Sequence, residues 1–494
     1  MKYLMLFIIL FLLFSNVKAE VTRSYDFQKY SIPAIIEQLQ FMKLNMSENS
    51  NLLNEWETLV DQLEHIPILP KRYRTILKDF KNKLVSESQL SLELRSRLIL
   101  SLNKLIMGRL PNEHKFMIKF SKEQVLDSFL KQFPGARRFH SKLLWVIFST
   151  RHEGRKLNSF DGSFVQIEKD IHISMEPLPE DGAAQLPPKL WGISRIGSET
   201  AWQNGLTGDG VIVAVVDSGV NHDHSGIRDQ MWINLAEMQG QVGLDDDGNG
   251  FIDDVHGYNF FDLDSDSMDY NGHGSHVAGT IAGWDPTVNF YGVAPKVKIM
   301  SVKTHNARGL SSKRAVVEGI LYAADNGARV INCSWSGAPE AANWSQLLHD
   351  AIEYARMKGA LVVAAAGNKG NYNDLNPVYP ACYANVISVA ATAYIADNVA
   401  SFSNYGIRTV HVAAPGSAIY SMTHENNQYM RASGTSMAAP HVSGAAALII
   451  QKLQENRIDK FTADEIKQIL MDHAIAVPGT ENKVATGIIS VENL

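Results

Sequence analysis

Hydrophobic positions change their spacing along this chain, and the change divides it into regions. After about residue 186, short uninterrupted apolar runs alternate with longer stretches in which apolar residues recur every three or four positions. The runs are typical of buried strands and the longer stretches of helices. The alternation predicts an α/β fold with a parallel sheet covered by helices on both faces. The predicted strands are residues 211–216, 298–302, 330–334, 361–366 and 386–390, and the predicted helices are residues 274–282, 313–326 and 344–358.

The chain before residue 186 has a different texture. Residues 20–110 show apolar positions at helical spacing and no residues that suggest chemistry, so we expect a helical extension there. Residues 112–173 predict a small α+β domain. Residues 174–185 are rich in Pro, Gly and Ala, which predicts an exposed linker that a protease can reach. In the small domain, the predicted strands are residues 116–120, 139–149 and 163–168, and the predicted helix is residues 122–133.

The first nineteen residues predict export. Lys2 supplies a positive start, residues 4–14 are apolar, and Val17-Lys18-Ala19 fits the small-residue cleavage pattern of a signal peptide. The apolar run is too short for a comfortable membrane span, and no second run of 18 apolar residues follows. We therefore expect residues 1–19 to be removed from a secreted protein, extracellular or periplasmic, with no stable membrane span.

Composition and charge narrow the picture further. With 494 residues, 45% of them hydrophobic, the chain is long enough for two or three domains. Residues 20–185 hold 24 Lys+Arg against 21 Asp+Glu, whereas residues 186–494 hold 20 against 31. These halves either attract each other or carry independent solvated surfaces. The larger, acidic part has no basic stripe, which argues against nucleic-acid binding. Cys333 and Cys382 make no disulfide framework or zinc site, and one bridge or two free thiols both fit.

Three polar residues fall where such a sheet would place a functional site. Asp217 ends the first predicted strand, and His273 lies between two glycines at the start of the first predicted helix. Ser436 follows Gly434-Thr435 and opens a run of small residues that predicts a closely packed helix. A helix N-terminus presents N–H groups that favour an oxyanion. Since the carboxyl ends of parallel strands share one edge, these side chains are expected to meet.

Their chemistry is complementary. Ser436 needs a general base, His273 can take its proton, and Asp217 can hold the imidazole tautomer and stabilise the imidazolium. Asn368, just past the predicted strand 361–366, can donate its side-chain amide to the oxyanion together with the backbone N–H of Ser436. His276, one turn beyond His273, is expected to be structural. Activity should rise as His273 deprotonates, with a limb roughly near pH 6–7.

Four motifs in chain order resemble the subtilisin-like serine peptidases, the subtilases: residues 213–220, 271–283, 331–337 with 362–368, and 434–444. The order Asp, His, Ser is the order of subtilisin. The resemblance covers residues 186–494, with 487–491 similar to the family's final strand. It implies a subtilisin-like three-layer sandwich with a mainly parallel sheet. It also implies a monomeric serine endopeptidase that hydrolyses protein or peptide substrates through an acyl-enzyme.

The resemblance also suggests a role for the upstream domain. Residues 112–173 look like the family's propeptide, an intramolecular chaperone and inhibitor whose C-terminal tail lies in the active site. The protein would then be a zymogen, with autocatalytic removal of the propeptide at a cut within residues 174–185. A permanently attached domain is the alternative. Residues 20–110 have no counterpart in the simple family propeptide.

The same resemblance implies a substrate groove. Ser336 stands where Gly is usual, and Trp335 stands where a smaller apolar residue is usual, so Trp335 either crowds the S1 or S4 subsite or simply packs. No acidic residue marks the pocket walls, which favours an apolar or broad P1 preference over strict basic specificity. The implied S1 walls are Ser334, Trp335, Ser336, Gly337, Ala365, Ala366 and Gly367, and extended substrate would also pair with Arg308, Gly309 and Leu310.

Residues 244–254 repeat much of an EF-hand-type calcium loop. Asp245, Asp247 and Asn249 fall at positions 1, 3 and 5 of that loop, and Gly250 falls at position 6. The usual Glu at position 12 is missing, and Asp253 and Asp254 are candidate replacements. We expect these four acidic and amide residues, Asp245, Asp247, Asn249 and Asp254, to hold a structural Ca²⁺; a solvated acidic insertion is the alternative. The chemistry itself needs no cofactor.

Other functions fit parts of the sequence. A peptide-binding or adhesive protein on an inactive peptidase fold would lack a triad member, and none is missing. A dedicated processing peptidase with few partners is barely separated from a degradative enzyme by sequence. A sedolisin-type acid peptidase is disfavoured, because His273 occupies the position of the base.

Overall fold

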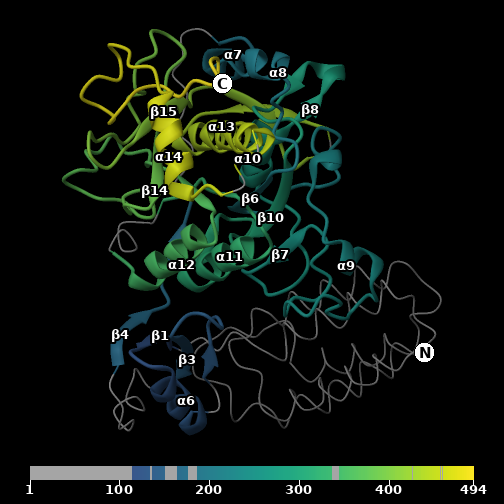
Figure 1. The fold of residues 1–494 in the computed structure, drawn as a ribbon, viewed down its shortest axis with the longest axis vertical. Helices are drawn as coiled ribbons and strands as arrows, with labels where there is room; N and C mark the ends of the chain where they lie inside the picture. Colours follow the sequence, from purple (N-terminus) through teal and green to yellow (C-terminus); the bar gives the residue numbers. More distant parts are fainter. Residues whose placement is uncertain are drawn as a thin grey trace, which may run out of the picture. The chain divides into compact units, whose positions relative to one another are not determined.

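The computed structural model describes residues 114–133, 136–150, 164–175, 186–336, 344–425, 427–456, 458 and 460–494 (Figure 1). The predicted signal peptide and helical extension, and linker residues 176–185, lie outside this part. Among the described residues, no helix combines the length and hydrophobicity needed to cross a lipid bilayer.

A seven-stranded sheet organises residues 186–494. Its strand order is β15-β14-β13-β12-β6-β10-β7, and the neighbours pair in parallel throughout. The carboxyl ends of the strands therefore meet at one edge, as predicted. The strands are β6 (Ile212–Asp217), β7 (Gly257–Asn259), β10 (Lys298–Lys303), β12 (Val330–Cys333), β13 (Leu361–Ala365), β14 (Val386–Thr392) and β15 (Val412–Pro415).

Successive residues of β6 enter two separate cores, because side chains of a strand alternate between its faces. Val213 and Val215 belong to the core that contains residues of α10 and α13, whereas Ala214 and Val216 belong to the core that contains residues of α11 and α12. Figure 1 shows these two helix pairs on either side of the strands. The predicted three-layer α/β sandwich is confirmed. The helices are α10 (His273–Ala282), α11 (Lys313–Asp325), α12 (Gln346–Met357), α13 (Thr435–Glu455) and α14 (Ala463–Asp472).

Every strand and helix predicted for this domain is present, with ends within two residues of the prediction. The exception is the expected final strand at residues 487–491, where Ile488 forms only isolated bridges to Ala413 and Ile475. The shorter elements are α7 (Trp191–Ile196), α8 (Ser198–Gln203), η2 (Arg228–Gln230), α9 (Leu235–Gln239), β8 (Trp284–Asp285), η3 (Pro286–Val288), β9 (Phe290–Tyr291), β11 (Leu310–Ser312) and the antiparallel pair β16 (Ile419–Met422) and β17 (Tyr429–Ala432).

A second, smaller sheet precedes this domain. Its four antiparallel strands have the order β2-β3-β1-β4, and α6 packs on one face. The strand predicted at residues 139–149 begins later, at Trp145, because a loop separates it from β2. A further short strand, β5, pairs with β11 of the large domain. The elements are β1 (His114–Phe120), α6 (Glu123–Gln132), β2 (Arg137–Arg138), β3 (Trp145–Thr150), β4 (Phe164–Lys169) and β5 (His172–Ser174).

Side chains of the small sheet also alternate between two surroundings. Ile118 and Val146 pack with residues of α6. Met117, Trp145 and Ile147 instead join the core that contains residues of α11 and α12. The second face of the small sheet is therefore buried against helices of the large domain.

Candidate active site at the carboxyl edge of the sheet

The buried carboxylate of Asp217 binds the ring of His273. Asp217 is the last residue of β6, and His273 is the first residue of α10. His273 Nδ1 lies 2.8 Å from Asp217 Oδ1 and 3.0 Å from Oδ2. The backbone N–H of Ser218 also donates to Oδ1, at 2.7 Å. These donors compensate a carboxylate with no solvent exposure, as an ion buried at this depth requires.

The start of α10 fits closely against the turn that follows β6. A Cβ on Gly274 would lie only 2.1 Å from the carbonyl oxygen of Gly219, so a larger residue there would push His273 away from Asp217. The N–H of Gly274 donates to Ser218 Oγ at 3.0 Å. The close approach of the Gly219 carbonyl therefore explains why residue 274 is a glycine.

The two histidines of α10 have opposite electrostatic environments. Burial opposes protonation of His273, but the adjacent Asp217 carboxylate outweighs it and raises the pKa of His273 above its ordinary value. Burial lowers the pKa of His276 to about 3, and its Nε2 lies 3.0 Å from the carbonyl oxygen of Ile419. His276 is therefore a neutral, structural residue, whereas Asp217 favours the protonated form of His273.

Ser436 is the second residue of α13, at the helix N-terminus that the sequence predicted. Its hydroxyl donates to the carbonyl oxygen of Ser334 at 2.8 Å, and Ser334 Oγ donates to the carbonyl oxygen of Ser436 at 2.9 Å. Because one hydroxyl donates one proton, the Ser436 hydroxyl does not donate to His273 in this arrangement.

Asn368 is held from the same helix N-terminus. Its Oδ1 accepts hydrogen bonds from the backbone N–H of Thr435 at 2.8 Å and from Thr435 Oγ1 at 2.9 Å. The N–H of Gly367 donates to that same hydroxyl at 3.1 Å. Since the amide oxygen faces Thr435, the amide nitrogen of Asn368 lies on the other side of the group. The sequence carried no signal for this role of Thr435 beyond its place beside Ser436.

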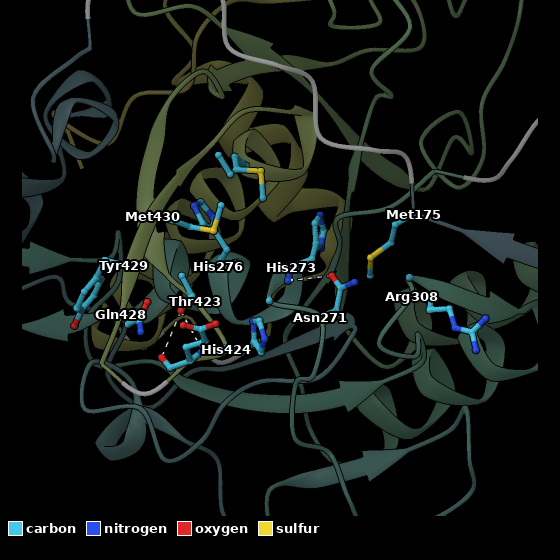
Figure 2. Close-up of a pocket in the computed structure, with 15 residues that line it drawn as sticks. Met175, Asn271, His273, His276, Arg308, Thr423, His424, Gln428, Tyr429 and Met430 are labelled. Atoms are coloured by element: carbon cyan, nitrogen blue, oxygen red, sulfur yellow. Dashed lines mark hydrogen bonds between the residues drawn. The ribbon is translucent and has the colours of Figure 1, made fainter. Parts of the chain in front are cut away.

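A cavity of about 570 Å³ opens beside His273. Figure 2 shows Met175 and Arg308 on one side of His273, and His424 and Gln428 on the other. The first side belongs to β5, β11 and their flanks, and the second to the loop between β16 and β17. His273 therefore lies between two groups of residues that line the cavity.

The residues expected to bind substrate divide into two groups. Leu310 of β11 pairs with Ser174 of β5, and the N–H of Met175 donates to the carbonyl oxygen of Gly309 at 2.9 Å. Arg308 and Gly309 line the cavity. The edge of β11 thus already binds an extended segment of this same chain. Of the expected S1 walls, Ser334, Trp335, Ser336, Ala365 and Ala366 are buried, Gly367 bonds to Thr435, and Gly337 lies outside the described residues.

Trp335 packs beneath the groove. Its side chain is 2% exposed, and its Nε1–H donates to the carbonyl oxygen of Val216 at 2.9 Å. It shares a core with Ile173 of β5. Of the two roles open from the sequence, packing is the one that this position favours.

The acidic loop brings together a different set of ligands from the predicted one. Carboxylate oxygens of Asp245, Asp247 and Glu237 lie within 4.8 Å of one another. Glu237 is in α9, outside the loop motif, so the motif spacing gave no signal for it. Hard oxygen ligands at this spacing fit Ca²⁺. Asn249 Oδ1 accepts from the N–H of Phe251 at 2.7 Å.

Asp254 has other partners. Its oxygens accept hydrogen bonds from Asn234 Nδ2 at 2.9 Å, Asn249 Nδ2 at 3.0 Å and the Tyr322 hydroxyl at 2.5 Å. Burial raises the pKa of Asp254 to about 6. It is not one of the three converging carboxylates, and its two oxygens already accept three hydrogen bonds.

The two cysteines are free thiols. Cys333 lies in the buried strand β12, where burial raises the pKa of its thiol well above the ordinary value. A thiol that stays protonated is a poor nucleophile, so Cys333 is not a candidate for the catalytic nucleophile.

Known proteins match this chain over the same region. A model of the Subtilase family matches residues 208–488. The chain is 37% identical over 303 residues to thermitase of Thermoactinomyces vulgaris, a match that covers 61% of this chain and 94% of thermitase. It is 32% identical over 390 residues to an alkaline protease of Alkalihalobacillus alcalophilus, covering 77% and 91%. It is 36% identical over 303 residues to Subtilisin Savinase of Lederbergia lenta, covering 61% and 97%. The chain therefore belongs to the subtilase family and is a subtilisin-like serine endopeptidase.

Proposed function

We propose that this protein is a secreted endopeptidase made as a zymogen, with Asp217, His273 and Ser436 as its catalytic triad. The observation that carries the proposal is the buried His273–Asp217 hydrogen bond at 2.8 Å, at the sheet edge where β6 ends. A carboxylate that orients a histidine is the arrangement that activates a serine. Ser436, at the N-terminus of α13, is the serine of the family motif.

In the proposed acylation, the Ser436 hydroxyl first rotates from the Ser334 carbonyl toward Nε2 of His273. As Oγ attacks the substrate carbonyl carbon, its proton passes to His273, and the carbonyl oxygen takes the electron pair as an oxyanion. The backbone N–H of Ser436 and the side-chain amide of Asn368 stabilise that charge. When the oxyanion collapses, the C–N bond breaks and the leaving amine takes the proton from His273.

Deacylation repeats these steps with water. His273 takes a proton from water, the oxygen attacks the acyl carbon, and collapse of the second oxyanion releases the carboxylic acid and returns the proton to Ser436. Asp217 stabilises the imidazolium in both halves. Raising the pKa of His273, as Asp217 does, stabilises that charged form.

Residues 114–175 act in this proposal as an inhibitor that occupies the cleft. The β5–β11 pairing is β-augmentation, the mode in which an extended substrate would bind. Met175, which follows β5, lines the cavity beside His273. An unprocessed chain therefore competes with substrate for the edge of β11.

Glu168 of β4 supports this docking. Its carboxylate accepts hydrogen bonds from Lys313 Nζ at 2.7 Å and from Ser345 Oγ at 2.6 Å. The backbone N–H of Gln346, the first residue of α12, donates to it at 2.8 Å. A carboxylate at a helix N-terminus is favourable, and this one is also buried. Asp170 accepts from the N–H of Arg314, near the start of α11, at 3.1 Å.

Basic groups of the small domain also meet acidic groups of α11 and α12. Lys119 Nζ lies 2.6 Å from Asp350, and His140 Nε2 lies 2.8 Å from Asp325. Such exposed or partly exposed pairs contribute little individually, about 0–1 kcal/mol each. They agree with the opposite net charges of the two regions.

The 390-residue match to the alkaline protease also supports a propeptide, since a match covering 77% of this chain must include residues before 186.

Maturation is proposed to cut within residues 174–185. Pro177 and Pro179 make the bonds Glu176–Pro177 and Leu178–Pro179 tertiary amides. In these two bonds, the nitrogen that His273 would have to protonate is part of the pyrrolidine ring. We therefore expect the cut at another bond of this segment. The predicted signal peptide at residues 1–19 would export the precursor beforehand.

A structural Ca²⁺ is proposed for the acidic loop. Glu237, Asp245 and Asp247 would hold it, and Asn249 Oδ1, which accepts the N–H of Phe251, has a second lone pair that it would contribute. The bound cation would neutralise converging negative charges and stiffen the loop. It takes no part in peptide hydrolysis, because the triad supplies nucleophile and base.

The proposal is tested by comparing secreted wild type with Ser436→Ala and Ser443→Ala on a denaturing gel, with intact mass and N-terminal sequencing. Ser443 is a buried serine two turns further along α13. We expect wild type and Ser443→Ala to yield a band near the size of residues 186–494, and Ser436→Ala to keep its propeptide. Equal processing of all three would contradict autocatalysis. Absence of both processing and peptidase activity in wild type would contradict the whole proposal.

A further inference from the structure

The direction of the cleft is defined by the segment that already lies in it. β5 runs antiparallel to β11, and its chain continues through Met175 toward His273. Residues that precede a scissile bond would therefore lie along β11. Residues that follow the bond must then lie at the other end of the cavity, beyond His273, where the leaving amine is released.

That other end is formed by the loop between β16 and β17. Thr423, His424, Glu425 and Gln428 all line the cavity. Figure 2 shows Thr423, His424 and Gln428 together on the side of His273 opposite Arg308. Of these four side chains, only that of Glu425 is a carboxylate.

Hydrogen bonds hold the described residues of this loop. The N–H of Thr423 donates to the carbonyl oxygen of Gln428 at 2.9 Å, and the N–H of Gln428 donates to that of Glu425 at 3.2 Å. The N–H of Glu425 donates to Thr423 Oγ1 at 3.1 Å. Asn221 Nδ2 donates to the carbonyl oxygen of His424 at 2.8 Å and so ties the turn to the loop after β6. The backbone of Glu425 is therefore held in place.

His424 fills the space between this turn and the catalytic histidine. A Cβ on Gly272, the residue before His273, would lie 2.8 Å from His424 Nδ1. Gly272 has φ +99°, which also favours glycine. His424, the residue before Glu425, therefore lies close to the residue before the catalytic histidine.

The charges along the cavity are unequal at its two ends. Arg308 lies on the β11 side of His273, and Glu425 lines the cavity with His424 and Gln428, which lie on the opposite side of His273 (Figure 2). Within the described residues, no ion pair engages the Glu425 carboxylate, which is exposed. A cationic side chain of the substrate would be the partner that this carboxylate lacks.

We propose that Glu425 is a specificity-determining residue that selects a Lys or Arg in the first few residues after the cleaved bond. The inference rests on the proposed function, because it uses His273 as the point of cleavage. Exposed ion pairs are worth up to about 1 kcal/mol, so the preference for Lys over an uncharged residue should be about three- to fivefold. It should weaken in high salt, which screens exposed charges.

The test measures kcat/KM of the matured enzyme on matched peptides that carry Lys, Gln or Glu at one of the three positions after the cleaved bond. Wild type should rank Lys above Gln above Glu at one or more positions. In Glu425→Gln the Lys-to-Gln ratio should fall to near one, and in Glu425→Lys the order should invert. Glu481→Gln, which removes an exposed carboxylate outside the cavity, should keep the wild-type ranking.

Two results would overturn the inference. One is a wild type that cleaves all the peptides without a charge preference at any position. The other is a Glu425→Gln variant whose Lys-to-Gln ratio equals that of wild type, including one that loses activity equally on every peptide. Failure of the proposed function is distinct from both, because it would appear as cleavage that persists in Ser436→Ala or as a wild type that cleaves none of the peptides.

Discussion

The two sheets of this protein bury their faces in different ways. The seven-stranded sheet is covered on both faces by helices that belong to the same domain. The four-stranded sheet has one face under α6, while Met117, Trp145 and Ile147 on the other face pack with residues of the core around α11 and α12. The small sheet therefore depends on the large domain for part of its core. The large sheet is covered on both faces by its own helices.

The largest effect is expected from a variant that should abolish catalysis at the large sheet and leave the docking of the small sheet unchanged. Asp217→Asn should lower kcat by roughly 10⁴-fold, because the histidine loses its orienting carboxylate. The docking contacts of Glu168 do not involve Asp217, so the precursor should still protect the small sheet from hydrogen exchange. Asp223→Asn, an exposed carboxylate nearby, should change kcat less than twofold. Near-normal turnover in Asp217→Asn would contradict the triad.

The next largest effect is expected from a substitution in the core that the small sheet shares with the large domain. Trp145 is fully buried, and its Nε1–H donates to Asp350 of α12 at 2.8 Å. Trp145→Ala should destabilise the small sheet by about 3–5 kcal/mol, because it leaves a cavity and removes that bond. Hydrogen exchange measured in the uncleaved Ser436→Ala background should speed up in residues 114–150 and stay slow in β6.

The neighbouring residue provides the control for this prediction. Val146 faces α6 instead of the large domain. Val146→Ala should cost less stability and should leave the contact with α12 intact. If both variants exposed β6 to exchange equally, the large sheet would depend on the small one, and the comparison would fail.

The same local reasoning explains how much of the molecule could be predicted from sequence. Apolar runs and helical spacing located the strands and helices of the large domain, and Asp217, His273, Ser436 and Asn368 fell at strand ends and helix starts where a parallel sheet places functional groups. These features depend on residues close in the chain.

The features that escaped prediction depend on residues far apart in the chain. Glu168 reaches the N-terminus of α12, 178 residues away, which no local pattern encodes. Glu237 joins Asp245 and Asp247 from a separate helix, outside the loop motif. The packing of Trp335 under Val216 likewise depends on how β12 lies beside β6.

A smaller effect concerns the acidic loop of the large domain. Removal of Ca²⁺ with a chelator should leave Glu237, Asp245 and Asp247 to repel one another, since like charges at this distance oppose folding. Ca²⁺ at 100 times its dissociation constant would stabilise the fold by about 2.7 kcal/mol. The melting temperature of the matured enzyme should therefore fall by about 4 °C on chelation. Glu237→Gln should reduce this calcium dependence; an unchanged melting temperature with and without chelator would argue against the site.

The smallest effect is a shift along the pH axis. Only neutral His273 can accept the proton of Ser436, and Asp217 raises the pKa of His273 above the ordinary 6.5. The protonated, inactive form should therefore persist to higher pH than for an isolated histidine. The acidic limb of kcat/KM should have its midpoint above 6.5, and a flat profile between pH 5.5 and 8 would count against His273 as the base.

The most direct test of the central claim is covalent labelling of the matured enzyme with a serine-directed fluorophosphonate, followed by mass mapping of the modified peptide. The account predicts one label on Ser436 in wild type and in Ser443→Ala. In His273→Ala, labelling should slow by several orders of magnitude, because the serine has lost its base. A label on another serine, or equal labelling rates in wild type and His273→Ala, would contradict the proposed Asp217–His273–Ser436 mechanism.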